Sequence, residues 1–149
     1  VGAYHVLELD TDGTKQAEHF INAVGEDLSG RLIPAVEVRL RGLYRLLPPD
    51  YYEAADNLAD FCDRIEKQYG VRPVIYCTER TYKNIVASDS RFNKDKIWYE
   101  SLFSKPDEDM DWTFWTYTNR VKFSFYESGE YLHMTVFNGS EDDFKKLIL

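Results

Sequence analysis

Two charged residues, Glu37 and Arg39, interrupt an apolar run from Leu32 to Leu40. Residues two apart in a β-strand point to the same side, so both charges would share one face, with Val36 and Val38 on the other. A carboxylate there can act as a general base or activate water, provided that a second group supplies a proton. Arginine keeps its proton at every working pH. We therefore interpret Glu37 as a charge balanced by its neighbours, with a catalytic role as the alternative.

Glu100 and His133 are two further candidates for acid–base chemistry. Glu100 ends a strand-like run from Lys96 and shares a face with Trp98. Histidine is the side chain that proteins use most often as a general base, so His133 is a candidate for that role. A lone histidine is more commonly a polar residue held by hydrogen bonds, and this is the interpretation we favour.

Aromatic side chains recur next to these charges. Stacked rings and charged groups together are typical of clefts that bind sugars, because rings cover apolar sugar faces while charges bind hydroxyls. Strand parity separates Trp112 from Trp115, so part of the set must belong to the core. The candidate rings are Tyr4, Tyr76, Trp98, Trp112, Trp115 and Tyr117.

Strand-like and helix-like segments alternate along the chain, which predicts an α/β fold with a mainly parallel sheet. The expected strands are residues 2–9, 32–40, 73–77, 96–100 and 112–117, followed by a hairpin of 123–126 with 131–137 around Ser128-Gly129. Helices are expected after Asp12-Gly13, from Pro48-Pro49-Asp50 to Gly70, at 82–87, and from a capping pair of Ser140 and Asp143 to Leu149.

Bulk composition excludes several classes of function. The chain has 149 residues, 44% of them hydrophobic, which suffices for one domain with a real core. A net charge of −8 disfavours nucleic acid as a partner, and apolar runs of five or six residues are too short to span a membrane. Cys62 and Cys77 have no metal-ligand spacing, so we expect buried thiols, with a disulfide as the alternative. The acidic segment 107–111 lacks the pattern of a calcium loop.

Seven segments in order resemble the glycoside hydrolase family 25 muramidases. The resemblance implies an incomplete TIM-like (βα) barrel, with residues 1–149 forming a single domain that lacks the first two βα units. It also implies peptidoglycan or a related glycan as partner, no cofactor, and a secreted or cell-wall-associated protein of bacteria or phage. The segments are 2–5 (GAYH), 16–20 (QAEHF), 33–39 (IPAVEVR), 73–76 (PVIY), 97–98 (IW), 112–118 (WTFWTYT) and 136–139 (VFNG).

Departures from the family pattern fall on its catalytic positions. Arg39 stands where the family has its catalytic glutamate, and Glu37 where it has an aspartate. His133 and Thr135 replace the aspartate and asparagine that precede the segment VFNG, and Thr116 replaces a glutamine. The resemblance therefore implies a lysozyme-like domain that is catalytically degenerate and has at most residual binding of cell-wall glycan. An active muramidase that uses Glu37 with a relocated acid, Glu100, and an interaction module on the same scaffold are the alternatives.

The resemblance also yields three structural expectations. Since related sequences carry a basic residue at position 100, Arg39 and Glu100 are expected to form a swapped ion pair within about 3.2 Å. His5, which matches a family histidine, is expected to order the barrel mouth. The first and last strands should have open outer edges that favour self-association. The expected substrate-binding residues are Tyr4, Tyr76, Trp98, Glu100, Trp115, Thr116 and Thr135.

Overall fold

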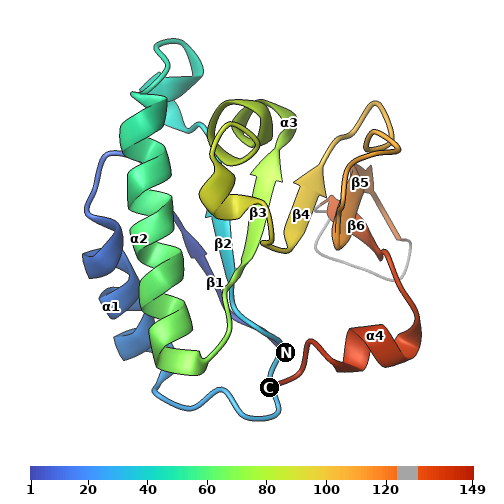
Figure 1. Ribbon diagram of the computed structural model, residues 1–149. Helices are drawn as coiled ribbons and strands as arrows, with labels where there is room; N and C mark the ends of the chain where they lie inside the picture. The colour runs from blue at the N-terminus through green and yellow to red at the C-terminus, as the bar shows by residue number, and fades with distance from the viewer. Residues whose placement is uncertain (124–130) are drawn as a thin grey trace.

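A six-stranded open sheet organises the chain, as a computed structural model that describes residues 1–123 and 131–149 shows (Figure 1). The strands follow the chain in the order β1 to β6, with β1 to β5 parallel and β6 antiparallel to β5. The expected α/β class is confirmed. The strands are β1 (Tyr4–Val6), β2 (Ala35–Val38), β3 (Val74–Thr78), β4 (Ile97–Glu100), β5 (Phe114–Val121) and β6 (Leu132–Phe137).

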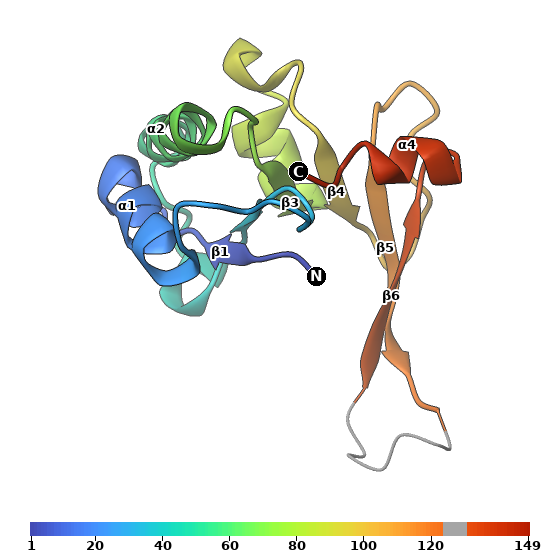
Figure 2. The ribbon, with the colours of Figure 1, turned by 90° about the horizontal axis from the view of Figure 1, so that it is seen from below.

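Two long helices, α1 (Gly13–Val24) and α2 (Tyr51–Tyr69), cover one face of β1 to β3 (Figures 1 and 2). Each begins at an aspartate whose side chain accepts hydrogen bonds from free backbone N–H groups of the first turn, Asp12 from Lys15 and Asp50 from Tyr52. Gly70 ends α2 with a φ of 74°, a left-handed conformation that glycine adopts without strain. The sequence predicted both helices correctly.

Shorter helical elements connect the strands. The helix expected at 82–87 is confirmed as a π-helical turn, η2. The Ser140–Asp143 capping box also forms, but α4 ends at Lys145 instead of continuing to Leu149. The remaining elements are the 3₁₀ helices η1 (Gly42–Arg45) and η3 (Ser90–Phe92), α3 (Glu79–Thr81), η2 (Tyr82–Val86) and α4 (Glu141–Lys145).

The main core lies between α1, α2 and the outer face of the sheet. Val36 and Val38 of β2 are fully buried there against Leu58, Phe61 and Ile65 of α2. Glu37, which lies between the two valines, points to the opposite face, as the period of two predicted. Cys62 and Cys77 are free thiols buried in this core, which confirms the expected state.

The C-terminal hairpin corrects the sequence prediction. Instead of a strand at 112–117 followed by a separate hairpin, β5 itself pairs with β6, from Phe114 opposite Phe137 to Val121 opposite Leu132. The register shifts between Thr116 and Thr118 and again before Val121, and irregularities of this kind break the alternation on which the prediction rested. The segment 124–126 and the Ser128-Gly129 turn lie outside the described residues. Figure 2 shows the hairpin extending beyond the rest of the sheet.

The last three residues return to the start of β2, on the inner side of the sheet. The Ile33 amide donates to the Leu147 carbonyl (2.8 Å), and the Leu149 amide donates to the Arg31 carbonyl (2.9 Å). Leu147 is buried with Ile33, Ala35 and Val74 in a second, smaller core. The chain ends therefore lie close together (Figure 1).

In the part of the chain that the structure describes, no helix has the length and apolar character needed to cross a membrane.

Candidate functional site

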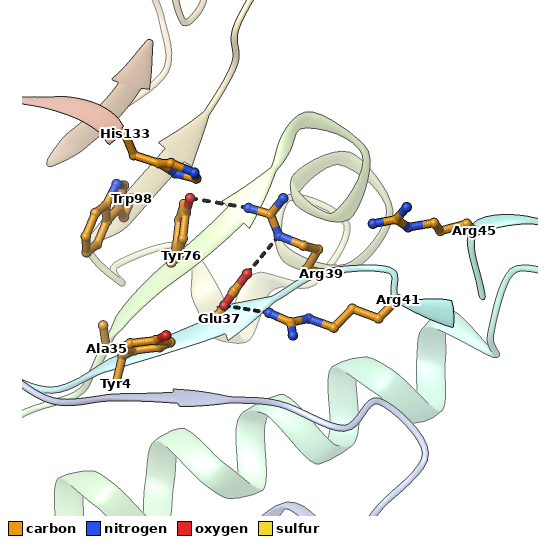
Figure 3. A pocket seen from close by; sticks show the side chains of 9 residues that line it. All are labelled: Tyr4, Ala35, Glu37, Arg39, Arg41, Arg45, Tyr76, Trp98 and His133. Carbon is orange, nitrogen blue, oxygen red and sulfur yellow. Dashed lines mark hydrogen bonds and ion pairs between the residues drawn. The ribbon is translucent and has the colours of Figure 1, made fainter. Parts of the chain in front are cut away.

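A cleft of about 580 Å³ opens on the inner face of the sheet, toward the carboxyl ends of its parallel strands (Figure 3). Adjacent parallel strands bring inward residues side by side: Glu37 is in register with Tyr76, and Tyr76 with Trp98. The lining residues are Tyr4, Ala35, Glu37, Arg39, Arg41, Arg45, Tyr76, Trp98 and His133.

Arg39 lies between two carboxylates. Its Nε donates to Glu37 Oε1 at 2.7 Å, and its Nη2 donates to Glu100 Oε2 at 2.6 Å. The expected ion pair of Arg39 with Glu100 is thus confirmed. Arg41 Nη2 donates to the other oxygen of Glu37 at 3.0 Å. Both glutamates are nearly buried, with 7% and 8% of their surface exposed, so these contacts replace much of their hydration.

The contacts of Glu100 favour its ionised form. Burial by itself would raise the pKa of Glu100, but hydrogen bonds from Arg39 and from the Tyr76 hydroxyl outweigh it and keep that pKa below its ordinary value. Burial and the bond to Glu100 raise the pKa of Tyr76. Burial would lower the pKa of Arg39, yet Glu100 raises it overall. At neutral pH, Glu100 is therefore a carboxylate with no proton to donate.

The aromatic wall of the cleft is built by Trp98 and Tyr76, whose rings stack with centroids 4.7 Å apart. Trp98 Nε1 donates to Thr116 Oγ1 at 2.8 Å, and Thr116 Oγ1 lies 2.7 Å from Thr135 Oγ1. Thr116 is 1% exposed, so it orients Trp98 from behind and is not itself open to a ligand. Tyr4 also lines the cleft, and it is 65% exposed, so its ring is open to a ligand.

Trp115 does not lie in this cleft, contrary to its predicted role in binding substrate. It is in register with Tyr99, on the helix-facing side of the sheet, whereas its neighbour Thr116 is in register with Glu100. Its Nε1 donates to the Ser101 carbonyl at 3.0 Å, and its ring contacts that of Trp112. The position follows from strand alternation, which places Trp115 and Thr116 on opposite faces.

The two histidines near the sheet also differ from expectation. His5 does not order the mouth: it faces the helices, stacks on Phe61 with ring centroids 5.0 Å apart, and is hydrogen-bonded to Gln16 Oε1. Tyr4 takes the inward position because adjacent strand residues point opposite ways. His133 does line the cleft, but it is exposed and forms no hydrogen bond to another described residue, so it is not the satisfied core residue that we predicted.

Arg41 and Arg45 are lining residues that the sequence analysis missed. Arg41 follows Glu37 and Arg39 at the same spacing of two, which is a signal that could have found it. Arg45 belongs to the 3₁₀ turn η1, whose position no sequence pattern predicted. Within the described residues, no group of His, Cys, Asp or Glu side chains is arranged to hold a metal ion.

The open α/β sheet, with a charged and aromatic cleft at the carboxyl ends of its strands, has the architecture of a TIM-like barrel glycosidase. Comparison with protein families identifies the particular one: the model of the glycosyl hydrolases family 25 matches residues 1–124, and the chain belongs to this family. A comparison with curated protein sequences found no match.

Solved structures agree with this assignment. A family 25 glycosyl hydrolase from Bacillus anthracis is 30% identical, with a TM-score of 0.85 over 100% of this chain and 69% of its own. The Streptomyces coelicolor lysozyme (23% identity, TM-score 0.78) and the Acremonium alcalophilum muramidase (23%, 0.74) share the fold. Both match 98% of this chain, which covers 70% and 71% of their own lengths respectively.

Proposed function

We propose that this domain binds peptidoglycan glycan strands in its cleft without hydrolysing them. The observation that carries the proposal is the position of Arg39, which forms ion pairs with both carboxylates of the cleft. Arg39 also stands where the family resemblance implies the catalytic glutamate.

Hydrolysis of a glycosidic bond needs a protonated carboxyl group beside the leaving oxygen and a second carboxylate nearby. General acid assistance of this kind typically contributes about 10² to 10⁴ in rate. Arg39 cannot supply it, since a guanidinium does not release its proton. Glu100 cannot take its place, because the hydrogen bonds from Arg39 and Tyr76 lower its pKa. In this arrangement neither Arg39 nor Glu100 can donate the proton that cleavage requires.

Sugar binding depends on groups that Arg39 leaves free. The ring of Tyr4 is open to solvent, and Trp98 lies in the same wall of the cleft. Rings of this kind stack on the apolar faces of sugars without any acid. Because relatives that share this fold are a lysozyme and a muramidase, cell-wall glycan is the ligand class that we propose.

Release of reducing sugar from purified cell walls tests the catalytic half of the proposal. We expect the chain to release no more than a mock preparation. Release well above that background, abolished by Glu37→Gln or Glu100→Gln, would overturn it and establish an active muramidase with a relocated acid.

Cosedimentation with insoluble peptidoglycan tests the binding half. Loss of a stacking ring costs about 1 kcal/mol, so Tyr4→Ala should weaken binding about fivefold. The matched control is Tyr52→Ala, which removes a ring that is 87% exposed on α2, outside the cleft. Absence of binding by the intact chain, or equal loss in both variants, would contradict the proposal.

A further inference from the structure

The cleft has two chemically different ends. In Figure 3 the rings of Tyr4 and Trp98 lie toward one end, and the guanidinium groups of Arg41 and Arg45 toward the other. Arg39 and Glu37 lie between them, joined by their ion pair. A ligand that fills the cleft would therefore meet rings at one end and cations at the other.

The two outer arginines retain hydrogen-bonding capacity. Arg41 uses one nitrogen for Glu37, and 53% of its side chain is exposed, so other donors of its guanidinium remain open. Arg45 is exposed and forms no ion pair or side-chain hydrogen bond with any described residue. Arg39, in contrast, is committed to Glu37 and Glu100.

The balance of charge in the cleft is opposite to that of the whole chain. Three guanidinium groups line it, against the two carboxylates that Arg39 bridges, whereas the whole chain has a net charge of −8. In a protein with a net negative charge, a local excess of arginine distinguishes this end of the cleft. The planar fork of arginine also matches carboxylate and phosphate oxygens in a two-point contact.

We infer that the cleft selects an anionic glycan, with a sugar ring against Tyr4 and Trp98 and an acidic group bound by Arg41 and Arg45. This inference rests on the proposed function and names the class of glycan. In peptidoglycan the acidic group would be a carboxylate of the muramic acid residue or of its peptide stem. In a phosphorylated wall polymer it would be a phosphate.

Calorimetric titration with three soluble oligosaccharides of equal length tests the inference. They are a neutral N-acetylglucosamine oligomer, an oligomer with alternating N-acetylmuramic acid, and a phosphorylated N-acetylglucosamine oligomer. We expect the intact chain to bind an acidic oligomer more tightly than the neutral one. Arg45→Gln should weaken binding of the acidic oligomer about tenfold and leave the neutral oligomer unaffected, because it removes a charge-assisted hydrogen bond.

Arg31→Gln is the matched control, since it makes the same change in net charge at an exposed position beside the C-terminal segment, outside the cleft.

If the intact chain prefers the muramic acid oligomer or the phosphorylated one, and Arg45→Gln removes that preference, the result supports the inference and identifies the anion. Equal affinity for acidic and neutral oligomers, with Tyr4→Ala weakening both, would overturn the inference and leave the proposed function standing. Binding of none of the three would overturn both. Equal effects of Arg45→Gln and Arg31→Gln would reduce the preference to general electrostatics and overturn the anion site.

Discussion

The guanidinium of Arg39 contacts two carboxylates that are themselves almost removed from water. Removing one partner of such an arrangement costs more than the attraction that is lost, because the remaining charges stay buried without compensation. Arg39 therefore stabilises the cleft in addition to determining its chemistry. The two effects can be separated by measuring stability and glycan binding on the same variants.

At the residue scale, Arg39→Ala should lower the free energy of unfolding by about 3 kcal/mol at pH 7. Urea denaturation measures this change. The control is Arg91→Ala, which also removes contacts with two carboxylates, those of Asp56 and Asp89, but near the surface. Exposed pairs contribute at most about 1 kcal/mol, so a loss as large for Arg91→Ala as for Arg39→Ala would contradict the argument.

The difference in stability between the intact chain and Arg39→Ala should depend on pH. The folded-state pKa of Glu100 is lowered, so its contribution to stability is complete above the unfolded pKa and is lost as the pH falls through the folded one. Without Arg39, burial would instead raise the pKa of Glu100, and protonation would relieve the buried charge. The stability deficit of Arg39→Ala should therefore shrink from pH 7 toward pH 4. A deficit that grows on acidification would show that Glu100 does not titrate as described.

The inner residues of the sheet were predictable because strand alternation is a strong geometric constraint. Parity placed Glu37 and Arg39 on one face of their strand, the family resemblance paired Arg39 with Glu100, and the structure agrees with both. The same rule shows why the expectations for His5 and Trp115 failed: each is next in sequence to an inward residue. The family resemblance suggested roles for them, but a resemblance does not override the alternation of side chains.

At the scale of elements, the contact between α1 and α2 has no spare space at Gly13. A Cβ at this position would lie 1.8 Å from the Asn57 carbonyl oxygen, which belongs to the backbone of α2. The Asn57 side chain also donates to the Leu9 carbonyl just before α1. The start of α1 is therefore fixed against the middle of α2.

Gly13→Ala should destabilise the protein by about 1 to 3 kcal/mol, because the two helices must separate to admit the methyl group. Thermal or urea denaturation measures the effect. Thr14→Ala, at an exposed position on the same turn of α1, is the control and should change stability by less than about 0.5 kcal/mol. Equal small effects in both variants would mean that the helices are not in tight contact.

Helical periodicity predicted both long helices, and the strand that forms β6 was also predicted, but its pairing with β5 was not. Apolar residues at helical spacing identify the face of a helix that packs on the sheet, and both α1 and α2 show this spacing. The register shifts after Thr116 produce no such pattern in the sequence, because the residues of a bulge face no single partner. The position of Arg45 was unpredictable for a similar reason, since a 3₁₀ turn has no long-range pattern.

At the scale of the whole molecule, the sheet has two edges that pair with no other strand among the described residues, those of β1 and β6. Backbone groups of residues 3 and 7 bond to β2, so by alternation those of Tyr4 and Val6 point outward. Unpaired edges of this kind are templates for another chain. The exposed ring of Tyr4 adds apolar surface to the β1 edge.

We predict that the chain self-associates through β1 in a concentration-dependent way, measured by sedimentation velocity. Tyr4→Lys should shift the distribution toward monomer, because a charged edge disfavours pairing. Tyr52→Lys makes the same substitution on exposed α2 and should leave the distribution unchanged. A monomer at every concentration would contradict the prediction.

The C-terminal segment provides a second connection between the β5–β6 hairpin and the rest of the sheet. The β5–β6 hairpin joins the rest of the sheet through three residues of β4, and residues 147–149 tie the chain beyond the hairpin to the start of β2. Deleting residues 147–149 removes the three backbone hydrogen bonds that join them to residues 30–33 and the burial of Leu147, together roughly 3 to 5 kcal/mol. This second connection should make unfolding cooperative. In the intact chain, amides of β3 and β6 should exchange with deuterium in one global opening. After the deletion, the amides of β6 should exchange first. Ile148→Ala, which trims a partly exposed side chain and keeps the backbone bonds, should preserve the single opening. If the deleted chain still exchanges as one unit, the pairing of β4 with β5 alone transmits unfolding across the sheet.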